Sequence, residues 1–257
     1  MDLTILIPCY NEADNVPGLH ARLLPVGADL ATDRDVEILF VDDGSEDGTY
    51  DALREAFGTT NPARLQVRFE RHSVNRGLGA ALRTGAAAAR GAVVVTTDSD
   101  GTYEFSEIPR LLSHLTPDVD IVTASALHPG GRVVGVPPHR MIPSRGVSTL
   151  YRLLVGPKIH TYTCLFRAYR RDVLNHVSWE SDDFLGVTEI FVRAMLMGYR
   201  VGEAPATIRP REYGSSKARL ARTVIAHLRF LSRILLHRLR VVSLVEPRRI
   251  GRDRGAA

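Results

Sequence analysis

The chain of 257 residues lacks any run of 18 apolar residues, and its start lacks the basic, long apolar and small-residue segments of a signal peptide. We therefore expect a protein that is made and kept in the cytoplasm. Cysteine is scarce: Cys9 and Cys164 lie in apolar or aromatic surroundings, without CxxC spacing or clustered histidines. This pattern indicates neither a disulfide framework nor a metal knot, and predicts two buried thiols.

Acidic residues are scarce near the end of the chain. From residue 209 to residue 254 basic residues recur every few positions, and the acids are Glu212, Glu246 and Asp253. The net charge of the whole chain is only +4, so the basic character is concentrated in this segment. We expect a negatively charged partner, and nucleic acid, anionic lipid and a phosphate-bearing substrate all fit.

The first half alternates short apolar strands with helix-like segments. Strands are expected at residues 3–7, 37–41, 65–69 and 92–97, and helices at 12–24, 48–57 and 79–90. This alternation predicts an α/β fold, a mostly parallel sheet with helices on both faces. Ligands of such sheets bind beyond the carboxyl ends of the strands.

The second half is less regular. We expect helices at 107–115, 144–154 and 190–198, strands at 120–125 and 163–169, and a mobile loop rich in proline and glycine at 128–138. Leucines spaced for one helical face alternate with arginines further on, which predicts a basic amphipathic helix at 218–240. The expected organisation is a catalytic domain over 1–217, this helix, and a disordered tail at 247–257.

Asp98-Ser99-Asp100 directly follows the expected strand at 92–97. Two carboxylates so placed can hold a hard divalent cation whose remaining ligands are phosphate oxygens. A solvated turn is an equally simple explanation of the triplet taken alone.

Asp42-Asp43-Gly44-Ser45 ends another expected strand. Its acids can accept hydrogen bonds from a ribose or a base, and its glycine permits close backbone approach; a loop with a helix cap is the alternative. Gly77-Leu78-Gly79 lacks both the GxGxxG pattern and a GKS or GKT ending, which argues against a dinucleotide site and a P-loop.

In this order and spacing, the motifs resemble family 2 glycosyltransferases of the GT-A fold over nearly the whole chain. Ile7-Pro8-Cys9-Tyr10-Asn11-Glu12 and segments 41–49 and 76–81 are similar to the nucleotide-binding half, and Asp98-Ser99-Asp100 to the DxD metal motif. The resemblance implies that Asp98 and Asp100 hold Mg²⁺ or Mn²⁺ against the diphosphate. The implied nucleotide-binding residues are Pro8, Tyr10, Asn11, Glu12, Asp42, Asp43, Gly79 and Asp98.

The second half is similar to the dolichyl- or polyprenyl-phosphate mannosyltransferase branch, also called the dolichol-phosphate mannose synthase branch. The most diagnostic motif is the Arg-x-x-Gly-x-Ser-Lys stretch at 211–217. The resemblance implies an inverting enzyme that moves a hexose from GDP-mannose or a UDP-sugar to a polyprenyl phosphate. Arg140, Arg211, Ser216 and Lys217 are the expected phosphate-binding residues.

Three departures fall on the sugar and acceptor side: Thr102 replaces an amide, Ala126 replaces an arginine, and residues 161–165 differ from the usual Asp-x-Thr-Ser-Gly. A soluble family 2 enzyme acting on a hydroxyl of a small molecule or glycan is therefore the alternative. It would need a general base, for which Glu189 and Asp183 are the expected catalytic residues. A noncatalytic nucleotide-sugar-binding or nucleic-acid-binding protein is a third possibility, and the basic tail lacks the aromatics expected for nucleic acid.

The basic helix at 218–240 suits an in-plane anchor on the cytoplasmic membrane face, with leucines toward acyl chains and arginines toward headgroups. Its alternative is a core-packing helix with a solvated basic face. The expected partners are a nucleoside diphosphate sugar, a lipid phosphate and the membrane surface, but not nucleic acid, and the oligomeric state stays open.

Overall fold

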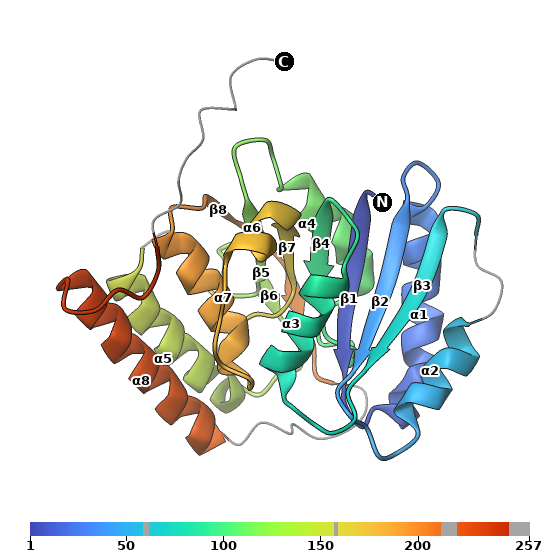
Figure 1. Cartoon of the computed structure of the whole chain (residues 1–257), viewed down its shortest axis with the longest axis horizontal. Helices are drawn as coiled ribbons and strands as arrows, with labels where there is room; N and C mark the ends of the chain where they lie inside the picture. Colours follow the sequence, from blue (N-terminus) through green and yellow to red (C-terminus); the bar gives the residue numbers. More distant parts are fainter. Residues whose placement is uncertain (59–61, 157–158, 212–219, 247–257) are drawn as a thin grey trace.

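The computed structural model describes residues 1–58, 62–156, 159–211 and 220–246, except for the side chains of His139, Arg140 and Leu220. Its centre is a seven-stranded sheet in the order β3-β2-β1-β4-β7-β5-β8, with helices on both faces (Figure 1). The predicted tail at 247–257 lies outside the described residues.

Most neighbouring strands of the sheet run parallel, as predicted. β1 (Leu3–Cys9), β2 (Val36–Asp42), β3 (Leu65–Arg71) and β4 (Val93–Thr96) form one parallel group, and β5 (Ile121–Ser125) runs parallel to β8 (Val201–Pro205). β7 (Arg167–Arg170) lies between β4 and β5 and is antiparallel to both. It is shorter than the strand predicted at 163–169.

The central strands are buried on both faces, which explains their nearly continuous apolar sequences. Along β1, Ile5 and Ile7 belong to one hydrophobic cluster and Leu6 to the other. The alternation of side chains along a strand produces this division. The sheet thus carries two cores, one beneath each layer of helices.

Glu37 is a fully buried carboxylate in β2. It accepts hydrogen bonds from Thr4 Oγ1 at 2.6 Å, Arg68 Nη1 at 2.7 Å and the Arg90 amide at 3.0 Å. These donors replace the water that the carboxylate loses on folding, and they join β1, β2, β3 and the segment before β4.

Helices α1 (Val16–Leu30), α2 (Thr49–Phe57) and α4 (Ile108–Ser113) contribute to one core. Helices α3 (Leu78–Ala88), α6 (Arg171–His176) and α7 (Leu185–Leu196) contribute to the other. α5 (Pro138–Leu154) and α8 (Leu220–Arg238) lie side by side at one end of the molecule and extend this second layer (Figure 1). Short 3-10 turns at Ala13–Asn15 and Phe105–Glu107 precede α1 and α4.

Several elements differ from the sequence expectation. α5 begins at Pro138 rather than at residue 144, because a proline fits the first helical turn, where its missing N–H is not needed. The segment predicted as a loop at 128–138 contains β6 (Arg132–Val133), which pairs with β9 (Thr207–Ile208). α7 starts at Leu185 instead of residue 190, and α6, β8 and β9 were not predicted.

α8 packs into the domain through one side. Its Phe230, Leu231 and Ile234 belong to the same core as α5 and α7. The predicted leucine stripe is therefore divided, since Leu231 is buried whereas Leu228 and Leu235 are exposed. No helix among the described residues is both long and apolar enough to cross a membrane.

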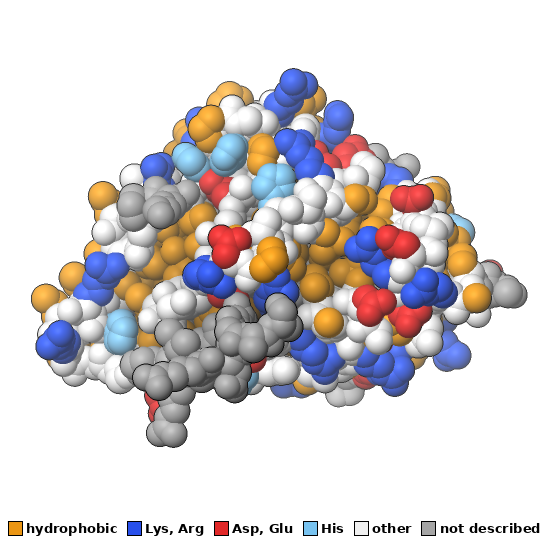
Figure 2. Space-filling view, turned by 90° about the horizontal axis from the view of Figure 1, so that it is seen from above, with side chains coloured by type: hydrophobic (Ala, Val, Ile, Leu, Met, Phe, Trp, Pro, Cys, Tyr) orange, Lys and Arg blue, Asp and Glu red, His pale blue; other side chains and the backbone are white. Residues whose placement is uncertain are grey.

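The outer surface of α5 and α8 is apolar and basic. The exposed apolar side chains of these helices are Ile142, Leu150, Leu153, Ile225, Leu228, Leu235 and Leu236. Arg222, Arg229, Arg233 and Arg238 are exposed on α8 between them. Figure 2 shows hydrophobic and basic side chains at this end of the molecule, and mixed acidic and basic side chains at the opposite end.

Candidate active site

Two adjoining cavities lie beyond the carboxyl ends of the parallel strands. The first, here called the polar cavity, has a volume of about 190 Å³ and is bordered by the segments that follow β1, β2, β3 and β4. The second, the apolar cavity, measures about 360 Å³ and reaches between α5 and α8. Leu78, Asp98 and Phe184 line both cavities, so the two spaces meet at these side chains.

Asp43 organises the floor of the polar cavity. Its buried carboxylate accepts the amides of Gly77 at 2.7 Å and Arg76 at 2.9 Å and the side-chain amide of Asn75 at 3.0 Å. His72 Nδ1 lies 2.6 Å from the same carboxylate. Asp43 therefore fixes the loop before α3 while facing the cavity.

The predicted nucleotide-binding residues fall into two groups. Pro8, Tyr10, Glu12, Asp43 and Asp98 line the polar cavity. The other three, Asn11, Asp42 and Gly79, do not line it.

The residues of the second group shape the surrounding backbone. Asn11 adopts a positive φ of 51°, accepts the Glu46 amide at 2.9 Å and donates its own amide to Ser45 Oγ at 2.9 Å. Asp42 is buried at the end of β2, next to Arg71 and the Ser45 amide. These contacts hold the turns from which the cavity-lining residues project.

Gly79 is required by close packing. A Cβ at this position would lie 2.1 Å from the Ser181 carbonyl oxygen, and the Gly79 amide donates to the Asp182 carbonyl at 2.7 Å. Gly77 has a φ of +98°, and a Cβ there would lie 2.3 Å from the same Asp182 carbonyl. The start of α3 is thereby held against the segment that carries Phe184.

Asp98 and Asp100 converge at the end of β4. Burial, followed by the charge of Asp100, raises the pKa of Asp98 to about 7, while Arg211 acts in the opposite direction. Asp100 is buried, accepts the Thr102 amide at 2.9 Å and forms an ion pair with Arg211, whose Nε lies 2.6 Å from its Oδ2. The pair of acids thus carries an excess of negative charge that Arg211 partly neutralises.

This donor set suits a hard divalent cation. Carboxylate oxygens are the ligands that Mg²⁺ and Mn²⁺ prefer, and such ions commonly complete their coordination with substrate phosphates and water. Within the described parts of the chain, no cluster of three or more His, Cys, Asp or Glu side chains could hold a metal. Asp98 and Asp100 would therefore need ligands from a bound diphosphate.

Glu189 lies away from both cavities. It is buried in α7. Its Oε1 accepts a hydrogen bond from Arg193 Nε at 2.8 Å, and its Oε2 accepts hydrogen bonds from the backbone amides of Glu180 at 3.2 Å and Ser181 at 2.8 Å. Both carboxylate oxygens are thus engaged in holding the segment before α7.

The other predicted site residues are scattered. Asp183 accepts the Leu185 amide at 3.1 Å at the start of α7 and does not line either of the two cavities. Arg140 is in α5, but its side chain is not described, and Ser216 and Lys217 lie outside the described residues. Of the four predicted phosphate-binding residues, the structure therefore places the side chain of Arg211 alone.

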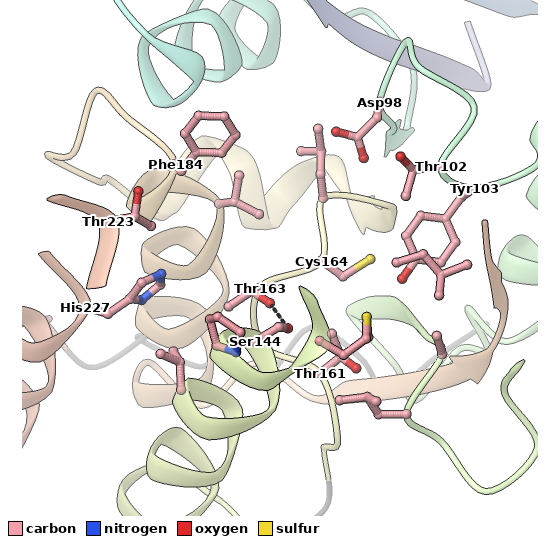
Figure 3. Close-up of a pocket in the computed structure, with 18 of the residues that line it drawn as sticks. Asp98, Thr102, Tyr103, Ser144, Thr161, Thr163, Cys164, Phe184, Thr223 and His227 are labelled. Atoms are coloured by element: carbon pink, nitrogen blue, oxygen red, sulfur yellow. Dashed lines mark hydrogen bonds between the residues drawn. The ribbon is translucent and has the colours of Figure 1, made fainter. Parts of the chain in front are cut away.

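The apolar cavity contains residues that the sequence motifs did not single out. Figure 3 shows Thr223 and His227 projecting from α8 on one side, with Asp98, Thr102 and Tyr103 across the cavity. Ser144 of α5 and Thr163 share a hydrogen bond of 2.7 Å between their hydroxyls (Figure 3). Phe184 and Leu78 line both cavities, but apolar character alone gives no reason to choose them from the sequence.

Both cysteines are buried and free, as predicted. Cys9 lines the polar cavity and Cys164 lines the apolar cavity. Burial raises the pKa of the Cys9 thiol, and it raises that of Cys164 to about 11. Both thiols are therefore protonated at neutral pH and act as small apolar wall residues.

Comparison with known proteins extends these observations. The sequence model described as glycosyl transferase family 2 matches residues 4–178. Polyprenol monophosphomannose synthase of Mycolicibacterium smegmatis is 37% identical over 220 residues, covering 83% of this chain and 79% of the relative. Undecaprenyl-phosphate mannosyltransferase of Micrococcus luteus is 32% identical over 223 residues, covering 84% and 87%.

Solved structures share the fold. Glucosyl-3-phosphoglycerate synthase from Mycobacterium tuberculosis, in complex with Mn²⁺, UDP and glucosyl-3-phosphoglycerate, superposes with a TM-score of 0.66 at 17% identity, covering 92% of this chain and 79% of the other. Mannosyl-3-phosphoglycerate synthase from Rubrobacter xylanophilus gives a TM-score of 0.68 at 18% identity, covering 96% and 78%.

Proposed function

The chain belongs to glycosyl transferase family 2 and has the GT-A fold, and from this premise we propose that it transfers a hexose from a nucleoside diphosphate sugar to a polyprenyl phosphate. The M. smegmatis relative is named as a polyprenol monophosphomannose synthase and the M. luteus relative as an undecaprenyl-phosphate mannosyltransferase, which supports this proposal. The sugar is mannose or another hexose, and the donor is GDP-mannose or a UDP-sugar.

The observation that carries this proposal is the meeting of two unlike cavities at Asp98. The polar cavity offers carboxylates, backbone turns and Arg211 to a nucleotide. The apolar cavity lies between two helices whose outer surfaces are apolar and basic, so it suits a lipid that enters from a membrane. A transferase for these substrates needs both spaces to converge at the reacting sugar.

On the donor side, Tyr10, Glu12 and Asp43 bind the nucleoside, and Asp98 and Asp100 hold Mg²⁺ or Mn²⁺ with the diphosphate. When bound, the metal neutralises the charge of the nucleoside diphosphate leaving group. Arg211, which contacts Asp100 and lines the same cavity, is placed to turn toward the phosphates. Asn11, Asp42 and Gly79 support this site through the backbone.

On the acceptor side, the reaction needs no strong general base. A phosphate monoester is already ionised at neutral pH, so it can attack the anomeric carbon in line and invert the configuration. This agrees with the position of Glu189, whose oxygens are both engaged by other protein groups. A hydroxyl acceptor would need such a base, and neither Glu189 nor Asp183 lines the apolar cavity.

The exposed surface of α5 and α8 is the proposed membrane-contacting face. Ile142 and Leu153 on α5 and Leu228 and Leu235 on α8 would enter the acyl boundary. The arginines of α8 would meet anionic headgroups. The same face lies beside the apolar cavity, so a lipid phosphate could enter without crossing water.

A panel of GDP- and UDP-sugars, assayed with Mn²⁺ and a short-chain prenyl phosphate, tests the proposal by nucleoside diphosphate release. We expect release that depends on the prenyl phosphate with one donor, and loss of that release in Asp100→Ala. The matching prenyl alcohol serves as the control acceptor and should be inactive. Equal release with the alcohol would favour a hydroxyl acceptor, and absence of release with every donor would refute transferase activity on these substrates.

A further inference from the structure

A buried polar pair joins the two helices that enclose the apolar cavity. His227 of α8 is only 4% exposed, and its Nδ1 lies 2.9 Å from the hydroxyl of Tyr151 in α5. Tyr151 is fully buried and packs against the rings of Tyr162 and Phe230. The neighbouring aromatic rings therefore hold the pair in place.

The direction of this hydrogen bond follows from the partners available. Within the described residues, the Tyr151 hydroxyl makes no hydrogen bond other than that to His227. A buried hydroxyl that only accepted a bond from Nδ1 would leave its own proton without an acceptor, which is unfavourable because the proton has lost its hydrogen bond to water. The hydroxyl therefore donates to Nδ1, and the ring proton of His227 is on Nε2.

Nε2 is the unsatisfied end of this pair. It makes no hydrogen bond to any described part of the chain, and His227 lines the apolar cavity (Figure 3). Burial lowers the pKa of His227 to about 4, so the ring is neutral at pH 7. The cavity thus contains a fixed, neutral N–H donor, although most of the side chains around it are apolar.

We propose that His227 is an acceptor-binding residue whose Nε2–H donates to a phosphate oxygen of the lipid acceptor, with Tyr151 fixing the tautomer that makes this possible. The inference rests on the proposed function. In a prenyl phosphate the hydrocarbon chain has no hydrogen-bond acceptor, and the phosphate carries them all. A prenyl phosphate that fills the cavity between α5 and α8 therefore satisfies Nε2 only through its head group.

This contact would select the acceptor by its head group. The matching prenyl alcohol keeps the chain but replaces the anionic oxygens with one weakly accepting hydroxyl. A hydrogen bond to a charged group is stronger than one between neutral groups. His227 therefore favours the phosphate over the alcohol without carrying a charge of its own.

The test compares His227→Leu with His227→Gln, because a glutamine amide nitrogen reaches nearly the position of Nε2 whereas leucine offers no donor. Binding of a short-chain prenyl phosphate is measured by calorimetry, together with the acceptor KM and kcat. We expect His227→Leu to weaken binding and raise KM roughly tenfold to a hundredfold, the worth of a hydrogen bond to a charged group. His227→Gln should stay close to wild type.

Two further measurements separate donor loss from damage to the fold. Tyr151→Phe keeps the aromatic ring but removes the hydroxyl that holds the proton of His227 on Nε2. This variant should raise the acceptor KM less than His227→Leu does, because His227 can still donate a hydrogen bond. Binding of nucleoside diphosphate with Mn²⁺ uses the polar cavity and should be unchanged in all three variants. Unaltered prenyl phosphate binding in His227→Leu, or equal losses in the Leu and Gln variants, would overturn the inference alone. Failure of wild type to bind or use prenyl phosphate would overturn the proposed function as well.

Discussion

Arg211→Gln should strengthen the binding of Mn²⁺ to the protein in the absence of nucleotide. In the structure, Nε of Arg211 lies 2.6 Å from Oδ2 of Asp100. A metal held by Asp98 and Asp100 would need the negative charge of the same carboxylate. The arginine and the metal therefore compete for the same carboxylate. Removing the arginine also leaves the repulsion between Asp98 and Asp100 unrelieved, which favours a cation further.

The expected change in the Mn²⁺ Kd follows from the burial of the ion pair between Arg211 and Asp100. Asp100 is 5% exposed and Arg211 is 32% exposed, so the pair is intermediate between surface and buried ion pairs. A surface pair contributes about 0–1 kcal/mol, and a hydrogen bond to a charged group about 1.5–3 kcal/mol. We take about 1.4 kcal/mol, which is a tenfold decrease in the Mn²⁺ Kd.

With nucleoside diphosphate present, the expected effect reverses. In the proposed complex Arg211 contacts the phosphates instead, so Arg211→Gln should weaken joint binding of Mn²⁺ and nucleotide and reduce the cooperativity between them. Free Mn²⁺ can be followed by electron paramagnetic resonance with and without the diphosphate. Arg209→Gln is the matched control, because Arg209 pairs with Glu104 outside both cavities. Unchanged or weaker Mn²⁺ binding by Arg211→Gln without nucleotide would refute the competition.

Three other substitutions test the fold and the membrane face. Gly79→Ala places a Cβ against the Ser181 carbonyl and should lower the unfolding free energy by about 2 kcal/mol in urea titrations, whereas a change below about 0.5 kcal/mol would contradict the packing argument. Burial would raise the pKa of Glu37, but hydrogen bonds from Thr4, Arg68 and the Arg90 amide hold it below its ordinary value. The stability this carboxylate contributes is therefore present above its unfolded pKa of about 4.3 and is lost as pH falls through the lower folded pKa. Glu37→Gln should lower the unfolding free energy by about 2 kcal/mol at pH 7, and the difference in unfolding free energy from wild type should narrow below about pH 4. A difference that stays constant with pH would show that the ionised carboxylate of Glu37 does not stabilise the fold. Leu228→Glu should reduce the protein's affinity for anionic vesicles more than tenfold, because the variant loses about 2 kcal/mol of leucine burial in the membrane and its new charge is repelled by the headgroups. Nucleotide binding should not change. Equal sedimentation of the variant and wild type with the vesicles would exclude this face as the membrane contact.

The parallel half of the fold was predictable because local pattern and tertiary structure agree there. β1 and β2 are short apolar runs buried on both faces, and each of the strands β1 to β4 is followed by a helical segment. The chemistry-bearing motifs follow the strands directly, so their convergence at one edge of the sheet follows from topology alone. Asp43 and Asp98 accordingly line the same cavity.

The second half was harder to predict because its elements depend on partners distant in sequence. β7 pairs antiparallel to β4 and β5, and β6 and β9 are two-residue strands that pair with each other. Such short strands carry no periodicity of their own. The start of α5 at Pro138 is hard to predict because proline is common in loops, although it is also well suited to a first helical turn.

Residue types alone also could not separate residues that face a cavity from those that position them. Asp42 and Asp43 are adjacent acids, yet only the latter lines the polar cavity, since neighbouring residues point in different directions. Glu189 and His227 are further examples of residues whose position could not be predicted from residue type. A carboxylate expected to be a base is engaged by amides and an arginine, whereas a histidine without any motif lines the apolar cavity.

The wall shared by the two cavities has a kinetic consequence. Leu78, Asp98 and Phe184 border both spaces, so in the proposed reaction the donor and the acceptor reach these side chains from separate sides. Neither substrate blocks the path of the other, and no covalent enzyme intermediate is needed to pass the sugar between them. Initial-rate plots should therefore intersect, with the nucleoside diphosphate product competitive toward the donor and noncompetitive toward the lipid. In the proposed reaction, each product can then leave through the cavity by which its parent substrate entered.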